Sequence, residues 1–259
     1  EQLCAAALRS QPSLVEAWLN LGVVRQANSD PAQAMECFRR ALELKPDYAE
    51  ARYNLGIAEL LMGQFESGWQ NYEARWQTSN PIFSSRGFAQ PLWQGEELAG
   101  HRLLVHAEQG HGDAIQFARY LPLLAHRGGQ IFLECPGPLT RLLGTVEGVT
   151  QVIARGEALP TFDVHVPLMS LPFRWKTTLE TIPHRGPYLR VPDGAAVHLP
   201  NHASARLKVG LTWAGSPQHG NDKARSIPLS SLSEWWWMML RNSLLSSGSA
   251  GGLCNKVSA

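Results

Sequence analysis

The sequence predicts a helical N-terminal region followed by an α/β domain built on a doubly wound, mostly parallel sheet. Three observations predict this fold class. A motif recurs with a period of 34 residues near the N-terminus, short apolar segments alternate with helical ones after residue 101, and a glycine-containing turn leads from the first apolar segment into a helix. The recurrence is typical of a repeat array, and the alternation is typical of parallel strands joined by crossover helices.

Composition places the chain among ordinary globular proteins. Its 259 residues are 44% hydrophobic and 17% charged, and the net charge of +1 gives no support to a nucleic-acid partner or a polybasic membrane patch. No apolar run is long enough for a membrane span. The four cysteines (Cys4, Cys37, Cys135 and Cys254) lack metal-ligand spacing. We therefore expect a cytoplasmic protein with reduced thiols, no metal and no cofactor.

The helical region is expected over residues 1–80. The triplet Asn-Leu-Gly at residues 20–22 returns at residues 54–56, and Phe38 aligns with Tyr72. Small residues let two helices approach closely, a large one fills the contact between them, and a proline ends the second helix because it has no N–H to donate. The residues in these roles are Trp18, Leu21, Gly22, Ala34, Phe38, Ala41 and Pro46.

This pattern resembles the tetratricopeptide repeat, strongly in the first copy and more weakly in the second. In the second copy Arg52, Gly68 and Arg75 stand where the first has Trp18, Ala34 and Ala41. Residues 1–12 match the second helix of a preceding repeat, so we expect the chain to begin with a partial repeat. Such an array serves most simply as a spacer or as a groove for a protein partner.

The next segments are a linker at residues 81–100, rich in Pro, Gly and Ser, and a Rossmann-like domain at residues 101–195. Strands are expected at residues 103–105, 130–134, 149–153 and 162–166. A helix is expected to open at Asp113 and to be kinked or ended early by Pro122. A second helix is expected near residues 138–143.

The turn after the first strand carries the groups best suited to chemistry. Gly110 and Gly112 let the backbone approach a ligand, and the start of the following helix offers unpaired N–H groups to an anion. Asp113 suits the N-cap position of that helix. Glu108, Gln109 and His111 crowd the same loop. Ligands of parallel sheets bind at the carboxyl ends of the strands, where this loop would lie.

A second basic turn follows a strand expected at residues 208–213. Arginine offers forked donors, lysine a point charge and serine a hydroxyl, a set that suits a phosphate or diphosphate. The alternative is a solvated loop. The residues of this turn are Ser216, Lys223, Arg225 and Ser226.

Four motifs together carry a wider resemblance: EQGHGDAIQFARYLP, LPTFDVHVPLMSLP, PYL and KVGLTWAGSPQHGNDKARSIPL. In this order, over residues 17–232, they resemble the tetratricopeptide-containing glycosyltransferases, which are related to the heptosyltransferases and to the O-linked N-acetylglucosamine transferases. The resemblance implies a GT-B architecture of two Rossmann-like domains. It places the acceptor on the first domain and the nucleotide-sugar on the second.

The resemblance also implies roles for individual residues. Asp113 matches the candidate general base that takes the proton of the acceptor hydroxyl. Gly110, His111, Gly112, Gln116 and Arg119 would line the acceptor site, although the family pattern has an apolar residue where this chain has His111. The basic turn (Ser216, Lys223, Arg225 and Ser226) would bind the donor diphosphate.

The end of the sequence departs from the family pattern. Residues 207–232 match the start of the second Rossmann-like domain, whereas residues 233–259 show no strand alternation and contain a cluster of tryptophans and methionines. We expect an incomplete second domain, an aberrant or disordered tail and impaired sugar transfer. An alternative interpretation of the tryptophan cluster is an exposed binding patch.

Two other functions remain open. The chain is alternatively a protein-interaction module whose α/β part is a non-catalytic platform. A third option is another phosphate-binding enzyme, against which the lack of a GxxxxGK[ST] or GxGxxG run counts. Several residues have simple structural interpretations as well. Asp113 would be only a helix cap, and the remaining ones would be core residues: His106, Trp93, Trp213 and Cys135.

Overall fold

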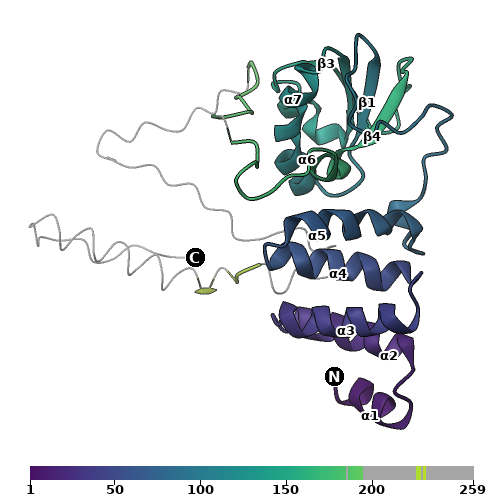
Figure 1. Ribbon diagram of the computed structural model, residues 1–259. Coiled ribbons are helices and arrows are strands. Elements are labelled where there is room, and N and C mark those ends of the chain that lie inside the picture. The colour runs from purple at the N-terminus through teal and green to yellow at the C-terminus, as the bar shows by residue number, and fades with distance from the viewer. Residues whose placement is uncertain (185, 195–225, 229, 232–259) are drawn as a thin grey trace, which may run out of the picture. The chain divides into compact units, whose positions relative to one another are not determined.

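The computed structural model describes residues 1–184, 186–194, 226–228 and 230–231. The strand expected at residues 208–213 and the tail at residues 233–259 lie outside the described residues, as do Ser216, Lys223 and Arg225. In the described part, the chain is a stack of helices followed by a parallel sheet with its own helices (Figure 1). This confirms the predicted fold class.

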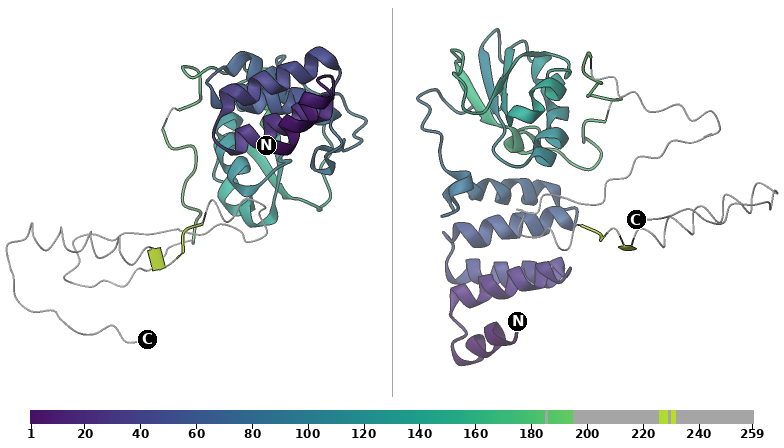
Figure 2. Two further views of the ribbon diagram at one scale, coloured as in Figure 1. Left: turned by 90° about the horizontal axis from the view of Figure 1, so that it is seen from below. Right: turned by 180° about the vertical axis from the view of Figure 1, so that it is seen from behind.

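The first helices pack as antiparallel pairs, α2 with α3 and α4 with α5, and the pairs lie in layers (Figures 1 and 2). Pro31 begins α3, and the Asp30 side chain accepts a hydrogen bond from the Gln33 backbone N–H at 3.1 Å, as expected of an N-cap. The helices are α1 (Gln2–Ser10), α2 (Val15–Ala27), α3 (Pro31–Leu44), α4 (Ala49–Leu61) and α5 (Phe65–Tyr72).

Close packing in the first hairpin depends on a glycine. A Cβ atom at Gly22 would lie 2.4 Å from the ring of Phe38, which is completely buried. The aromatic ring therefore occupies the volume that any other residue at position 22 would need. Helix α3 ends at Leu44, just before Pro46, as predicted.

The second hairpin follows the same plan but is shorter. Gly68 lies against Leu60, since an added Cβ would come within 2.8 Å of the leucine side chain. Helix α5 has only 8 residues and continues as a 3-10 helix, η1 (Glu73–Gln77). Arg75, at the position equivalent to Ala41, lies in η1 and is completely buried.

Within the described residues, four strands form one sheet in which all neighbouring strands are parallel. The order is β3-β2-β1-β4, so β1 is central and the chain crosses from one edge to the other between β3 and β4. In register, Val105 pairs with Leu133 of β2 and with Val166 of β4. The strands are β1 (Arg102–His106), β2 (Gln130–Cys135), β3 (Val149–Ala154) and β4 (Val164–Pro167).

The helix after β1 differs from the prediction at its start. Helix α6 (His111–Phe117) begins two residues before Asp113 and has Gly110 at its N-cap, so the prediction that Asp113 opens the helix is wrong. The chain continues through η3 (Ala118–Tyr120) into α7 (Leu121–Ala125), with Pro122 in the first turn of α7. The predicted interruption is therefore present, because proline is tolerated only where its missing N–H is not needed.

The two faces of the sheet are covered differently. Leu103, Val105 and Leu133 pack with residues of α6 and α7 in the main core. On the other face, Leu104 and Phe132 pack with Phe88, Leu159 and Phe162, which belong to loops. The described crossover from β3 to β4 contains no helix, unlike that of an ideal doubly wound sheet. The remaining short helices are η2 (Pro81–Phe83), η4 (Gly137–Leu139), α8 (Thr140–Leu143), η5 (Leu168–Ser170) and α9 (Leu171–Arg174).

The segment between the repeats and β1 is an ordered extension of the sheet. The Trp93 backbone N–H donates to the His165 carbonyl at 2.8 Å, and the His165 N–H donates to the Pro91 carbonyl at 3.1 Å. Trp93 and Leu98 are each 1% exposed. Trp93 is thus the core residue that the sequence predicts. Among the described residues, no helix has the length and apolar character needed to cross a membrane.

Candidate functional site

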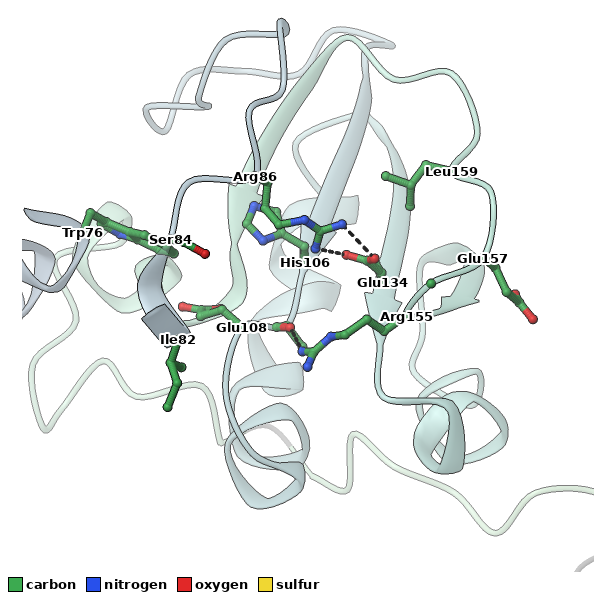
Figure 3. A pocket seen from close by; sticks show the side chains of 12 residues that line it. Trp76, Ile82, Ser84, Arg86, His106, Glu108, Glu134, Arg155, Glu157 and Leu159 are labelled. Atoms are coloured by element: carbon green, nitrogen blue, oxygen red, sulfur yellow. Dashed lines mark hydrogen bonds and ion pairs between the residues drawn. The ribbon is translucent and has the colours of Figure 1, made fainter. Parts of the chain in front are cut away.

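A cavity of about 410 Å³ opens at the carboxyl ends of β1, β2 and β3 (Figure 3). Strand residues form its base and the segment before β1 forms one wall. Charged side chains from different elements point into it (Figure 3). This is the edge of a parallel sheet at which ligands bind. The lining residues are Trp76, Ile82, Ser84, Arg86, His106, Ala107, Glu108, Glu134, Arg155, Gly156, Glu157 and Leu159.

One ion pair closes the base of the cavity. Arg86 donates two hydrogen bonds to the carboxylate of Glu134, at 2.6 and 3.0 Å. The Glu134 side chain is 2% exposed, whereas that of Arg86 is 37% exposed. The pair is therefore bidentate, with the carboxylate buried in the sheet and the guanidinium at the cavity wall. Each of the two charges is neutralised by the other.

A second ionic network joins the repeats to the cavity. Arg75 donates to Glu108 Oε1 at 3.1 Å and to Ser170 Oγ at 2.7 Å through Nη2, and to Glu73 Oε1 at 2.5 Å through Nη1. Glu108 follows β1 and Ser170 follows β4, so the guanidinium bridges the ends of two neighbouring strands. Its planar face also lies over the Trp76 ring. The last element of the repeats is thus fixed to the edge of the sheet that holds the cavity.

Glu108 is more deeply buried than Glu73, the other carboxylate of this network, and it also lines the cavity. Burial raises the pKa of Glu108, against the opposing attraction of Arg75 and of nearby backbone N–H groups. Its Oε2 atom is buried and has no hydrogen-bond partner of good geometry among the described residues.

Arg155 supplies a cation to the same cavity. Its Nη2 atom donates to the carbonyl oxygen of Ala107. In the described part of the chain, Arg155 forms no ion pair with a carboxylate, in contrast to Arg86. The remaining N–H groups of this guanidinium are donors available at the cavity.

Two histidines lie against each other, and one of them, His106, lines the cavity. His106 Nε2 is 3.3 Å from His165 Nδ1, and Phe88 packs edge-on against both rings. Burial, the neighbouring His165 and the charge of Arg86 lower the pKa of His106 to about 3, so this imidazole is neutral at physiological pH. The pKa of His165 is lowered for the same reasons of burial and Arg86. His106 is thus a buried, partnered histidine, one of the interpretations that its sequence position allows.

The predicted acceptor residues form a separate group at the start of α6. Asp113 Oδ2 accepts a hydrogen bond from the Gly110 N–H at 3.1 Å, so Asp113 stabilises the helix start from the third helical position and not from the N-cap. Gly110, His111 and Gly112 are exposed. None of the three, nor Asp113, is among the residues that line the cavity at the strand ends.

Gln116 and Arg119 lie further along the same segment. Arg119 Nε donates to the Gln116 carbonyl at 2.8 Å, and its guanidinium lies over the ring of Tyr188. Arg119 lines another cavity, of about 660 Å³, beside residues 180–184 and 186–190. Of the predicted phosphate-binding residues, only Ser226 is described, and it is half-buried.

The sequence interpretation missed the charged residues of the cavity. Arg86, Glu134 and Arg155 are not among the predicted site residues, and Glu108 is predicted only as part of a crowded loop. One signal is present for Glu134: it is an acidic residue in the otherwise apolar stretch IFLEC of β2. Arg86 and Arg155 gave no such signal because they lie in loops far from β2 in sequence.

Metal-ligating groups do not gather in the described residues. No group of three or more His, Cys, Asp or Glu side chains there is placed to hold a metal ion. Cys135 is completely buried, and burial raises the pKa of its thiol to about 11. It is the small buried core residue that the sequence predicts.

Comparisons with known proteins identify the repeats. Two models of the tetratricopeptide repeat match residues 15–48 and 37–70. The repeat character of these residues is therefore established. The matches coincide with helices α2 to α5, including the second copy that sequence inspection finds weak.

Curated relatives resemble only part of this chain. The chain is 27% identical to Protein FlbA of Caulobacter vibrioides over 161 residues, covering 47% of this chain and 26% of FlbA. It is 34% identical to the peroxisomal targeting signal receptor of Saccharomyces cerevisiae over 61 residues, covering 24% of this chain and 10% of the receptor. The chain thus spans about a quarter or less of the length of these relatives.

Among solved structures, a mutant O-GlcNAc transferase of Thermobaculum terrenum matches 53% of this chain and 33% of its own, with 15% identity and a TM-score of 0.30. A likeness of this size does not assign the α/β part to any family.

Proposed function

We propose that this protein is a tetratricopeptide-repeat glycosyltransferase that transfers a sugar from a nucleotide-sugar to an acceptor hydroxyl. The α/β domain described above would bind the acceptor. The observation that carries the proposal is that the segment bearing Asp113 and its neighbours follows the carboxyl end of β1, the edge at which parallel sheets bind substrates. The order of motifs in the sequence supports the same class of reaction.

In this proposal Asp113 is the general base. It lies in the first turn of α6, where its carboxylate is half-exposed and already accepts one hydrogen bond from Gly110. The second carboxylate oxygen is available to an acceptor hydroxyl. Gly110, His111 and Gly112 would contact the acceptor beside it. Lys223, Arg225, Ser216 and Ser226 would bind the donor diphosphate and stabilise the charge that develops on it.

A transfer assay tests the proposal. The protein is incubated with nucleotide-sugars and hydroxyl acceptors, and release of the nucleotide is measured beside binding by isothermal titration. Asp113→Asn is expected to lower turnover by about 10²- to 10⁴-fold, the usual contribution of a general base. Asp47→Asn, at an exposed position of the repeats, is the matched control and should leave turnover unchanged. Absence of both binding and transfer for every nucleotide-sugar would reject the proposal.

A protein-interaction module is the second candidate, favoured by the repeat models over residues 15–70. In that case the repeats bind a partner and the α/β domain is a platform. Partner capture would then be lost when the exposed Val23 of α2 is changed to Asp, and would be unaffected by Asp113→Ala. The glycosyltransferase proposal predicts instead that the protein transfers a sugar and that a change of Asp113 strongly lowers the rate of transfer.

A further inference from the structure

We infer that the cavity at the carboxyl ends of β1, β2 and β3 binds an uncharged polyhydroxy ligand of the sugar type through Glu108 and Arg155, and that Arg75 is a positioning residue for Glu108. The inference rests on the proposed function for the reaction in which that ligand would take part. It adds a carboxylate and a cation that lie apart from Asp113 and its neighbours.

The first observation is the unpartnered oxygen of Glu108. The side chain is 6% exposed and lines the cavity. Oε1 accepts from Arg75, whereas Oε2 has no hydrogen-bond partner of good geometry among the described residues. A buried carboxylate oxygen without a partner is unfavourable, so a water, an ion or a ligand group that donates a hydrogen bond to it would stabilise the site. Glu108 therefore offers the cavity a strong hydrogen-bond acceptor.

The second observation is the set of free donors on Arg155. Its guanidinium is held by one hydrogen bond to the carbonyl of Ala107, the residue before Glu108. It forms no ion pair within the described part of the chain. Since arginine carries five N–H donors in a fixed plane, most of them remain for a ligand. The guanidinium of Arg155, which follows β3, is thus held at Ala107, and the acceptor Glu108 is the next residue of the loop after β1.

The other charges of the cavity favour a neutral ligand over an anion. Arg86 is occupied by Glu134 through two hydrogen bonds. Arg75 shares its single charge between Glu73 and Glu108, and Glu157 also lines the cavity, so the negative charge left there disfavours a phosphate or a carboxylate. A hydroxyl group both donates and accepts, so neighbouring hydroxyls match Glu108 and Arg155 together. The apolar walls suit the C–H faces of a sugar ring, as in other small-molecule sites. They are formed by Trp76, Ile82 and Leu159.

Arg75 holds the carboxylate in place without lining the cavity. It is completely buried, and it contacts Glu108, Ser170 and Glu73. By engaging only Oε1, it leaves Oε2 for the ligand. Because η1 follows directly from α5, the position of Glu108 is tied to the last helix of the repeats.

The test uses neutral methyl glycosides of glucose, galactose, mannose and N-acetylglucosamine as probes, with inorganic phosphate as the anionic probe. Binding to the whole protein is measured by saturation-transfer NMR and by shifts of the arginine Nε–H signals. We expect at least one glycoside to bind and to shift the signal that disappears in Arg155→Lys. Glu108→Gln and Arg155→Gln should each weaken binding by tenfold or more.

Matched controls lie outside the cavity. Glu147→Gln and Arg141→Gln are exposed changes of the same chemical kind, and binding should be the same as in the unchanged protein. Arg155 is itself exposed, so its variant should fold even if Glu108→Gln does not. The inference is overturned if no glycoside binds, if Arg155→Gln binds as tightly as the unchanged protein, or if phosphate alone shifts the Arg155 signal.

The positioning role of Arg75 has its own readout, the pH dependence of glycoside binding. Glu108 is faced by Arg75 of η1, which also binds Glu73, by Tyr72 of α5 and by the backbone N–H of Met169 in η5. Binding should be lost as Glu108 is protonated. Since the charge of Arg75 lowers the pKa of Glu108, Arg75→Gln should move the midpoint of this loss to higher pH. An unchanged midpoint in a folded variant would leave Arg75 with a structural role only.

Failure of this inference is distinguishable from failure of the proposed function. Glycoside binding that depends on Glu108 and Arg155, with no transfer from any nucleotide-sugar, would support the binding site and reject the glycosyltransferase. Transfer that depends on Asp113 but is unaffected by Glu108→Gln and Arg155→Gln would support the glycosyltransferase and reject the binding site.

Discussion

The two repeats use the same helical frame for different purposes, and one pair of equivalent positions shows this directly. Ala41 in the first repeat and Arg75 in the second lie 34 residues apart, and both are completely buried. Ala41 packs within the helical stack, whereas Arg75 reaches the ends of β1 and β4 through Glu108 and Ser170. The second repeat departs from the repeat pattern at the place where it contacts the α/β domain.

The aromatic residues at equivalent positions of the two repeats, Phe38 and Tyr72, differ in the same way. Phe38 fills the hairpin against Gly22 and has no polar group to satisfy. Tyr72, its equivalent, is 5% exposed, and its hydroxyl accepts from Gln109 and lies 3.9 Å from the sulfur of Met169. Both partners of Tyr72 belong to the α/β domain. A weak match to a repeat pattern therefore indicates a contact with another part of the chain, and not a degraded repeat.

Removing Arg75 is the strongest way to break the second repeat's contact. Arg75→Ala would leave Glu73 and Glu108 without their buried counter-charge, and breaking such a pair typically costs about 3–5 kcal/mol. We expect a loss of that size in the free energy of unfolding, measured by urea denaturation at neutral pH. The control is Arg40→Ala, because Arg40 and Glu43 form an exposed pair on α3 with side chains 49% and 61% exposed.

The exposed pair should contribute within about 0.5 kcal/mol, since solvent screens it. Equal losses for Arg75→Ala and Arg40→Ala would contradict the buried network. A loss confined to the repeats, with the sheet still folded by hydrogen exchange, would show that the two parts unfold separately.

Acid sensitivity due to histidine should belong to the α/β domain, since residues 1–80 contain no histidine. The pKa of His106 falls from 6.5 to about 3 on folding, chiefly through burial. Between these two pH values the imidazole is protonated in the unfolded chain and neutral in the folded chain. The stability due to neutral His106 is complete above pH 6.5 and is lost as the pH falls toward 3. The slope for one such proton is about 1.4 kcal/mol per pH unit.

Urea denaturation from pH 7 to pH 4 measures this slope. His106→Phe should reduce the slope, because only the half-buried His165 then remains of the two histidines whose pKa is lowered on folding. A variant with the full slope of the unchanged protein would show that His106 is not the group responsible.

A smaller effect is expected at the equivalent aromatic positions. Tyr72→Phe removes the hydroxyl that contacts Gln109 and Met169, and the loss should be about 1 kcal/mol, the usual net value of a hydrogen bond. The reverse change, Phe38→Tyr, places a hydroxyl in a fully apolar site and should also destabilise the protein. If Tyr72→Phe is neutral by thermal unfolding, the hydroxyl contacts contribute no stability.

The repeats, the first strand and the interruption of the helix could be predicted from the sequence because they depend on local patterns. The repeat period, the strand at β1 and the interruption at Pro122 follow from spacing and from residue types that the backbone requires. The cavity was missed because it depends on contacts between distant residues. Arg86 meets Glu134 across 48 positions, and Arg75 meets Ser170 across 95. Neither partner reveals the other in a single sequence.

The start of α6 offers the smallest effect and the clearest separation of two roles for Asp113. Its carboxylate accepts from the Gly110 N–H at the exposed end of the helix, so Asp113→Ala should cost only about 0.5–1 kcal/mol in thermal unfolding. Asp113→Asn keeps a side-chain oxygen for this hydrogen bond and should cost less. A general base needs a carboxylate, and an amide cannot replace it. If Asp113 is the general base, Asp113→Asn should therefore preserve stability and remove transfer. If Asp113 only stabilises the helix start, Asp113→Asn should preserve both stability and transfer.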